Sequence, residues 1–181
     1  DVFKNSIGTN HAYGVFVQTS AGNTIQSNTV YGSYADGIQC WSGANATSII
    51  GNDVGYCGPG ADADGISIIG ARGCYVRLNS VHHVQSSGAN DGLKLVQLSG
   101  SFIEYNTTYS NWSAGVAVTP EATNCRVVGN NSYGNRGSGI YVASASNILV
   151  FSNVGHGNTG DGAANYGVGI MLNTYAGVGN R

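Results

Sequence analysis

Residues 28–40 read NTVYGSYADGIQC and contain the two features that decide the fold. The first feature is an asparagine, Asn28, that lies three residues after a β-branched or apolar residue. The second is a glycine, Gly37, followed by an aliphatic residue, Ile38, and, two places later, by another apolar residue, Cys40. Both features recur along the chain, which identifies them as the two anchors of an internal repeat.

The asparagine anchor recurs at intervals of 23 to 27 residues, at Asn5, Asn28, Asn52, Asn79, Asn106, Asn130, Asn153 and Asn180. The glycine anchor recurs inside each repeat, at Gly14, Gly37, Gly65, Gly92, Gly115, Gly139 and Gly169. After each glycine, two apolar positions flank a variable one, which is the period of two that is typical of a β-strand. Helical spacing is absent, so the pattern predicts an all-β protein.

Stacked repeats explain these columns, because a single coil could not bury its apolar face alone. We therefore predict a single-stranded right-handed parallel β-helix of about seven coils of 23–27 residues. The asparagine column predicts a ladder of side-chain amides at a bend. We expect one domain over residues 1–181. Because the chain begins partway through a repeat, we expect this domain to be either a mature form or a piece of a longer protein.

Composition argues against several kinds of partner. Charged residues make up 9% of the chain and the net charge is −2, so we expect no nucleic-acid partner. No apolar run approaches the roughly 20 residues of a membrane span. The four cysteines, Cys40, Cys57, Cys74 and Cys125, form no CxxC pair. The two that share a column, Cys74 and Cys125, lie two coils apart, roughly 9.6 Å, which is too far for a disulfide. We expect buried, free thiols.

The repeats differ in length on one side only. The distance from the asparagine anchor to the glycine anchor is 9 residues in four repeats, 13 in the third and fourth, and 16 in the last. The third and fourth insertions belong to neighbouring coils, so we expect their loops to stand together as a wall. Insertions confined to one face of a solenoid often mark the binding face.

Three aspartates, Asp36, Asp64 and Asp91, share the column directly before the anchor glycine. Stacked about 4.8 Å apart, ionised carboxylates would repel one another. Three interpretations follow: raised pKa values that suit acid–base chemistry, a bound cation such as Ca²⁺, or a capping role in which each carboxylate bonds backbone N–H groups of its own turn. Lys94 lies three residues after Asp91 and is expected to face outward.

Histidine and aromatic residues gather near the insertions. His82 and His83 are adjacent, and neighbours in a strand face opposite ways, so we expect at most one of them to join a site. Aromatic residues in or near the same side of the coil include Tyr34, Tyr56, Tyr109 and Trp112. Such rings either stack on sugars or simply cover a glycine-rich surface.

The repeat, as in residues 28–38 and again in residues 130–140, resembles the parallel β-helix repeats of mannuronan C5-epimerases and of the related alginate and uronate lyases. The resemblance covers nearly the whole chain, and similar repeats also occur in phage tail spikes and surface proteins. It implies a groove that holds a sugar chain and abstraction of the C5 proton of a uronate. Residues 13–15 (Tyr-Gly-Val) match the start of the epimerase stretch Tyr-Gly-Phe-Asp-Pro-His, whereas Phe16, Val17 and Gln18 occupy its Asp-Pro-His positions.

We therefore expect a secreted or cell-surface β-helix that acts on an acidic polysaccharide as a uronate lyase or C5-epimerase. The expected catalytic residues are His82, His83, Tyr56 and Tyr109, with Lys94 neutralising the uronate carboxylate. Trp112, Tyr34 and Asn90 are the expected substrate-binding residues. Asp36, Asp64 and Asp91 would bind a cation, with Ca²⁺ the one cofactor considered, or tune pKa values.

The alternative function is non-catalytic: a structural or glycan-binding solenoid, such as a segment of a tail spike, adhesin or surface filament. Open coil ends expose unpaired strand edges, so we also expect self-association through these ends as one way to cover them.

Overall fold

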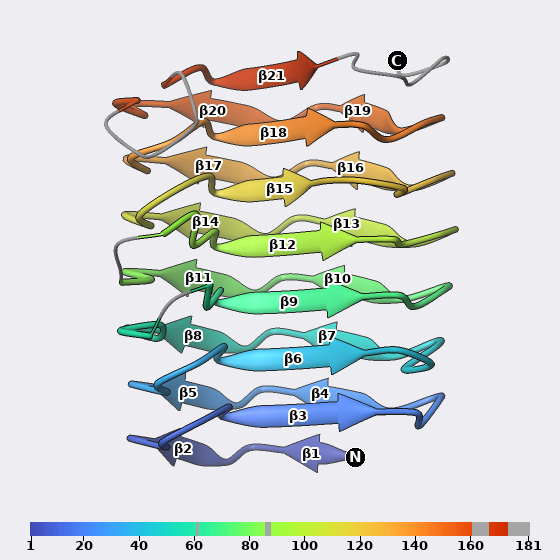
Figure 1. Cartoon of the computed structure of the whole chain (residues 1–181), viewed down its shortest axis with the longest axis vertical. Coiled ribbons are helices and arrows are strands. Elements are labelled where there is room, and N and C mark those ends of the chain that lie inside the picture. Colours follow the sequence, from blue (N-terminus) through green and yellow to red (C-terminus); the bar gives the residue numbers. More distant parts are fainter. Residues whose placement is uncertain (61, 86–87, 161–166, 174–181) are drawn as a thin grey trace.

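The computed structural model describes residues 1–60, 62–85, 88–160 and 167–173 and consists of short strands wound into a stack of coils (Figure 1). Each coil contributes one strand to each of three parallel sheets. Sheet A contains β1 (Val2–Phe3), β4 (Thr24–Gln26), β7 (Ser48–Ile50), β10 (Tyr75–Arg77), β13 (Phe102–Glu104), β16 (Arg126–Val128) and β19 (Leu149–Phe151).

Sheet B contains β2 (Ser6–Gly8), β5 (Thr29–Tyr31), β8 (Asp53–Gly55), β11 (Ser80–His82), β14 (Thr107–Tyr109), β17 (Asn131–Tyr133) and β20 (Val154–His156). Sheet C contains β3 (Val15–Gln18), β6 (Ile38–Trp41), β9 (Ile66–Ile69), β12 (Leu93–Val96), β15 (Val116–Val118), β18 (Ile140–Ala143) and β21 (Ile170–Asn173). Equivalent residues of successive repeats pair in parallel, as Ile25 does with Ile49. The predicted parallel solenoid is confirmed.

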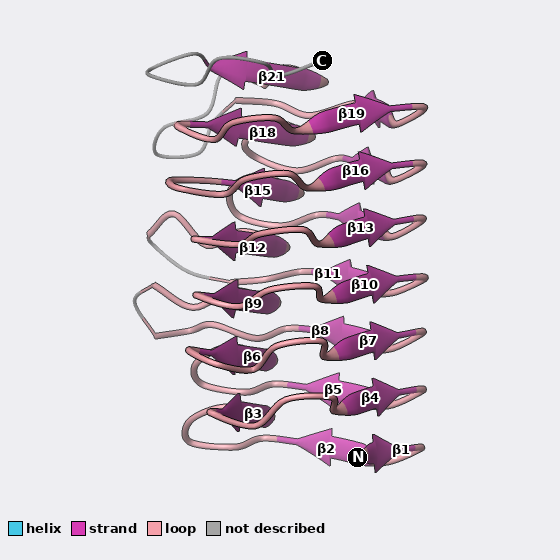
Figure 2. Cartoon of the chain, turned by 90° about the vertical axis from the view of Figure 1, so that its right-hand side faces the viewer, coloured by secondary structure: helices cyan, strands magenta, loops and turns pink. Residues whose placement is uncertain are grey.

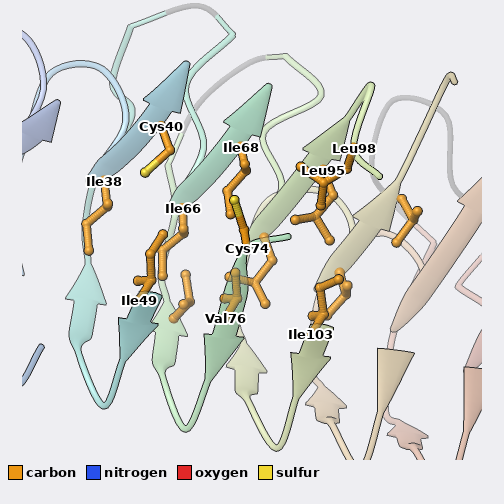
Figure 3. Close-up of a cluster of buried hydrophobic side chains, with 14 of the residues drawn as sticks. Ile38, Cys40, Ile49, Ile66, Ile68, Cys74, Val76, Leu95, Leu98 and Ile103 are labelled. Carbon is orange, nitrogen blue, oxygen red and sulfur yellow. The ribbon is translucent and has the colours of Figure 1, made fainter. Parts of the chain in front are cut away.

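The core is a set of apolar columns inside the coils. On sheet C the apolar residues one and three places after the anchor glycine point inward, so that Ile38 and Cys40 lie next to Ile66 and Ile68 of the following coil (Figure 3). Sheets A and B contribute single inward columns, such as the one that contains Ile49. All four cysteines are buried in these columns and free, as predicted. The described residues contain no helix long and apolar enough to cross a membrane.

The anchor glycines are explained by close approach between coils. A Cβ at Gly37 would lie 2.7 Å from the carbonyl oxygen of Gly65, and one at Gly65 would lie 2.7 Å from that of Gly92. Real side chains do not tolerate such distances, so only glycine fits where sheet C begins.

The predicted amide ladder is confirmed at the bend between sheets A and B. Each asparagine donates its backbone N–H and its Nδ2 to the Oδ1 of the next one, as Asn52 does to Asn79 at 2.9 and 3.0 Å. A second, shorter ladder lies between sheets B and C, where Asn111 donates to Asn135 and Asn135 donates to Asn158.

The insertions lie at the corner between sheets B and C, where the connections from β8 to β9 and from β11 to β12 project beyond their neighbours (Figure 2). These two loops contact each other: Gln85 N–H donates to the Cys57 carbonyl at 2.8 Å. The expectation that they stand together is confirmed. The last insertion includes residues 161–166, which lie outside the described residues.

Candidate functional site

A column of outward-facing positions runs along the end of sheet B, and all but one of its residues are aromatic. Its positions are in register from coil to coil and read Tyr31, Gly55, His82, Tyr109, Tyr133 and His156. The rings of Tyr109 and Tyr133 are stacked with centroids 5.3 Å apart, and those of Tyr133 and His156 are 5.2 Å apart. We call this set the aromatic column. The column was not predicted from the sequence, although every member lies three residues after a ladder asparagine.

His82 and His83 both lie on the outer surface, so they do not face opposite ways as expected, although only His83 lines the pocket described below. His82 is the last residue of β11, and His83 has a left-handed backbone conformation with φ of 51°, so the strict alternation of a strand ends there. Their Nδ1 atoms are 3.0 Å apart. Tyr56 stacks on His83 with centroids 4.7 Å apart, and Tyr109 stacks on His82 at 4.9 Å.

Beside this cluster lies a pocket of about 280 Å³. Its lining consists of Tyr56, His83, Val84, Gln85, Ser110, Trp112 and Arg136. Three of these, Tyr56, His83 and Trp112, are residues that the sequence singled out. Tyr109 and His82 contact His83 but do not line the pocket.

Arg136 is the residue that sequence analysis missed. Its guanidinium carbon lies 3.7 Å from the centroid of the Trp112 ring, a cation–π contact. Trp112 and Arg136 each follow a member of the second asparagine ladder, Asn111 and Asn135, so they occupy equivalent positions in successive coils. That shared position was the available signal.

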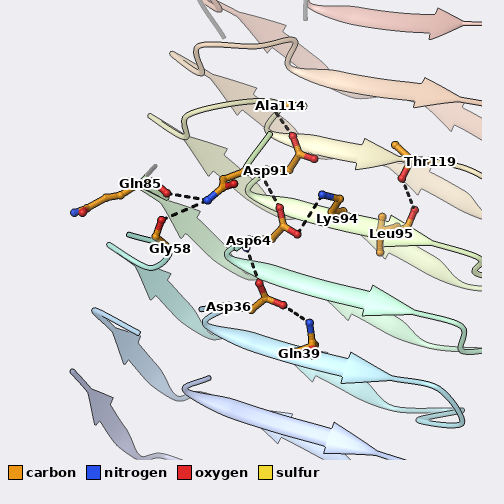
Figure 4. A network of polar contacts seen from close by, with 11 residues as sticks. Asp36, Gln39, Gly58, Asp64, Gln85, Asp91, Lys94, Leu95, Ala114 and Thr119 are labelled. Carbon is orange, nitrogen blue, oxygen red and sulfur yellow. Dashed lines mark hydrogen bonds and ion pairs between the residues drawn. The ribbon is translucent and has the colours of Figure 1, made fainter. Parts of the chain in front are cut away.

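Lys94 does not lie at the pocket. It faces outward from β12 on sheet C, and its Nζ is 3.7 Å from Oδ2 of the buried Asp64 (Figure 4). Lys94 is absent from the lining of the pocket. The cation that lines the pocket together with His83 is therefore Arg136, because the pocket opens at the end of sheet B whereas Lys94 projects from sheet C.

The aspartate column makes backbone hydrogen bonds between coils. Asp36 Oδ1 accepts the N–H of Asp64 at 2.7 Å, Asp64 accepts that of Asp91 at 2.8 Å, and Asp91 accepts that of Ala114 at 2.8 Å (Figure 4). Each carboxylate thus caps the coil above it rather than its own turn. In the part of the chain that the structure describes, no group of three or more His, Cys, Asp or Glu side chains could hold a metal ion. We therefore propose no Ca²⁺ at these aspartates.

Burial strongly raises the pKa values of the aspartate column. It raises the pKa of Asp36 to about 6 against the opposing effect of hydrogen bonds from Asp64 and Gln39. It also raises the pKa of Asp91 to about 6, and that of Asp64 well above its usual range, with the charge of Lys94 opposing both shifts. Burial opposes the charged form of Lys94, but the neighbouring aspartates outweigh it and raise its pKa. Burial therefore accounts for the raised pKa values that the sequence suggested. The three aspartates do not line the pocket.

The two remaining expected binding residues do not line the pocket. Asn90 is fully buried, and its Nδ2 donates to the carbonyls of Gln85 at 3.0 Å and Gly58 at 3.4 Å, so it joins the two insertion loops. A ligand could not reach it without moving these loops. Tyr34 is exposed and packs near Gly60, whose N–H donates to the Tyr34 carbonyl at 3.1 Å.

Comparison with known proteins defines the class. Residues 1–178 match the family model described as right handed beta helix region, so the chain belongs to this family and the predicted handedness is that of the family. No curated protein matches the chain.

Several solved structures are similar. The periplasmic alginate epimerase AlgG matches 81% of this chain and 33% of its own length, with 26% identity and a TM-score of 0.71. A single mutant of the same epimerase matches 93% of this chain and 46% of its own length, with 20% identity and a TM-score of 0.77. The Dettilon tailspike protein matches 97% of this chain and 43% of its own length, with 16% identity and a TM-score of 0.50. The chain thus spans less than half the length of each of these structures.

Proposed function

We propose that this β-helix acts outside the cytoplasm on an acidic polysaccharide, and that its pocket removes the C5 proton of a uronate in an elimination or an epimerisation. The observation that carries the proposal is the shared pocket of His83, Tyr56 and Arg136. The likeness to a periplasmic alginate epimerase supports the substrate class and the location.

Each of the three residues suits one requirement of this chemistry. Burial and the adjacent His82 lower the pKa of His83, which favours the neutral imidazole that a general base needs. Tyr56 also lines the pocket, and its hydroxyl can donate a proton. Arg136 is a cation that can bind a carboxylate in a bidentate manner and so stabilise the charge that develops when the C5 proton leaves.

Trp112 contributes apolar surface to the pocket. One face of its indole lies against the Arg136 guanidinium, which holds the guanidinium in place. The rest of the ring would contact the apolar face of a sugar.

The test is incubation with polymannuronate, alginate and pectate in deuterated water. Elimination would appear as ultraviolet absorption by unsaturated uronates, and epimerisation as deuterium at C5 in the NMR spectrum. His83→Ala and Arg136→Gln should each lower the rate by at least about 100-fold. Matched controls are His11→Ala, in an exposed bend, and Arg126→Gln, whose guanidinium lies over Phe102 on sheet A. Full activity in both pocket variants would exclude this pocket.

A second candidate function is non-catalytic binding of the same polysaccharide. It is favoured by the aromatic column, which continues past the pocket through Tyr109 and Tyr133 to His156. The likeness to a tailspike protein supports this candidate at the level of the fold. Binding measured by calorimetry, without product from any of the three polymers, would favour it over catalysis.

A further inference from the structure

We infer that Asp53 and His82 are positioning residues that hold His83 in the tautomer with its proton on Nδ1 and a free lone pair on Nε2. This inference rests on the proposed role of His83 as the base. Neither Asp53 nor His82 lines the pocket, so both would act through His83.

The three side chains form a chain of polar contacts across two coils. Asp53, the first residue of β8, places Oδ1 3.2 Å from Nε2 of His82. On the other side of the same ring, His82 Nδ1 lies 3.0 Å from His83 Nδ1. The side chain of His82 is 13% exposed and that of Asp53 is 56% exposed, so solvent reaches the carboxylate more readily than the imidazole.

The tautomers follow from the donors and acceptors available. An ionised carboxylate only accepts hydrogen bonds, so the proton of His82 must lie on Nε2. Nδ1 of a neutral His82 is then an acceptor and requires a donor at 3.0 Å. That donor is Nδ1–H of His83. A neutral His83 that carries its proton on Nδ1 has Nε2 free to accept a proton from a ligand in the pocket.

The absence of a side chain at position 55 makes room for the His82 ring. Gly55 occupies the aromatic column between Tyr31 and His82, and a Cβ there would overlap the His82 ring, with Nδ1 only 2.8 Å away. The imidazole thus lies in the space that a side chain at position 55 would fill, and this brings it within reach of Asp53.

Aromatic neighbours fix the orientations of the two imidazole rings. Tyr109 stacks on His82 and meets His83 edge-on with centroids 5.7 Å apart. Tyr56 stacks on His83 and meets His82 edge-on at 5.7 Å. Among the described residues, the titratable and charged groups around His83 are therefore Tyr56, Tyr109 and His82, with Arg136 in the same pocket lining and Asp53 beyond His82.

The C5 proton moves to Nε2 of His83, and the electron pair of the C–H bond stays on the substrate. In an elimination this pair expels the C4 glycosidic oxygen, which takes the Tyr56 proton; in an epimerisation C5 takes that proton instead. His83 is then an imidazolium whose Nδ1–H is already donated to His82. Transfer of that proton to His82 Nδ1 places the positive charge on the ring that contacts Asp53, which stabilises it.

The first experiment is ¹⁵N NMR of the histidine rings in the free protein, which needs no substrate. We expect His83 to show a protonated Nδ1 and an unprotonated Nε2 at neutral pH. Asp53→Ala and Gly55→Ala should both return His83 to mixed tautomers, the first by removing the acceptor and the second by displacing the His82 ring. Asp53→Glu should retain the wild-type tautomer, and Glu104→Ala on sheet A is the control. A wild-type His83 with its proton on Nε2 would overturn the inference.

The second experiment is the pH profile of turnover on whichever uronate polymer is converted. Asp53→Ala should lower the rate about 10- to 100-fold and move the acid limb to lower pH, because the imidazolium loses its counter-charge. Asp53→Glu should restore most of the rate. A lower rate with an unmoved acid limb would contradict the positioning role. The inferred tautomer without turnover of any polymer would support the inference while removing the proposed function.

Discussion

The Asn79 carboxamide oxygen accepts two hydrogen bonds from Asn52, one from the backbone N–H at 2.9 Å and one from Nδ2 at 3.0 Å. Asn79→Ala would leave the Asn52 backbone N–H and one of its two Nδ2 hydrogens unpaired in a buried bend, since the other Nδ2 hydrogen is donated to the Ile25 carbonyl. We therefore expect a loss of about 2–4 kcal/mol in the free energy of unfolding. Asn5→Ala, at the exposed end of the same ladder, should cost less than about 1 kcal/mol. Denaturant titration of both variants measures the difference; equal losses would contradict the buried ladder.

The anchor glycines predict a second difference in stability. A Cβ at Gly65 would lie 2.7 Å from the Gly92 carbonyl oxygen and would overlap Val81, whereas one at Gly8 would lie 3.5 Å from the Tyr31 carbonyl oxygen. Gly65→Ala should therefore destabilise the fold by about 3 kcal/mol, and Gly8→Ala by much less. Thermal unfolding followed by circular dichroism provides the comparison. If Gly65→Ala melted with the wild type, the close approach of coils would be wrong.

Asp36 predicts a dependence of stability on pH. Burial raises its pKa from 3.8 to about 6, so between these values the folded state keeps a proton that the unfolded state has released. The free energy of unfolding should thus fall as pH rises from about 4 to about 6. Asp36→Asn retains an acceptor for the Asp64 N–H and should stabilise the fold by about 1–3 kcal/mol at pH of about 8, with little effect at pH of about 4.

Chemical denaturation at these two pH values measures that effect, with Glu104→Gln on sheet A as the control. A variant with the same pH slope as the wild type would show that Asp36 keeps an ordinary pKa.

A variant of Tyr56 can distinguish binding from catalysis at the pocket. Tyr56→Phe keeps the ring that stacks on His83 but removes the hydroxyl. If the hydroxyl donates a proton in the reaction, turnover should fall by at least about 100-fold while polysaccharide affinity stays within about threefold. Tyr75→Phe, whose ring stacks on Phe102 on sheet A, is the matched control. Unchanged turnover in Tyr56→Phe would assign the proton donor to another group.

The thiols should be inert in the folded protein. Burial raises the pKa of Cys40 to about 12, and all four cysteines are buried. A thiol reagent at neutral pH should therefore label none of them until denaturant is added. Mass spectrometry before and after unfolding counts the labels, and rapid labelling of the native protein would contradict the buried columns.

Sequence alone sufficed for the repeat and its consequences. Asparagine and glycine anchors at fixed offsets predict coils, columns and the amide ladder, because each repeat places the same residue type at the same point of the next coil. The insertions were also predictable, since the interval that lengthens is the one from the asparagine anchor to the glycine anchor, on one side of the coil. These features depend on position within a repeat, which a sequence records directly.

Tertiary structure decided which side chains meet. Alternation in a strand separated His82 from His83, but the left-handed backbone at His83 brings both rings to one surface. Spacing placed Lys94 near the site, but the pocket lies one sheet away and its cation is Arg136. Side-chain contacts between coils depend on where each strand ends and on which neighbour lacks a side chain, as Gly55 does beneath His82. The one-dimensional repeat therefore determined the scaffold, whereas backbone conformation and packing at its corner determined the candidate site.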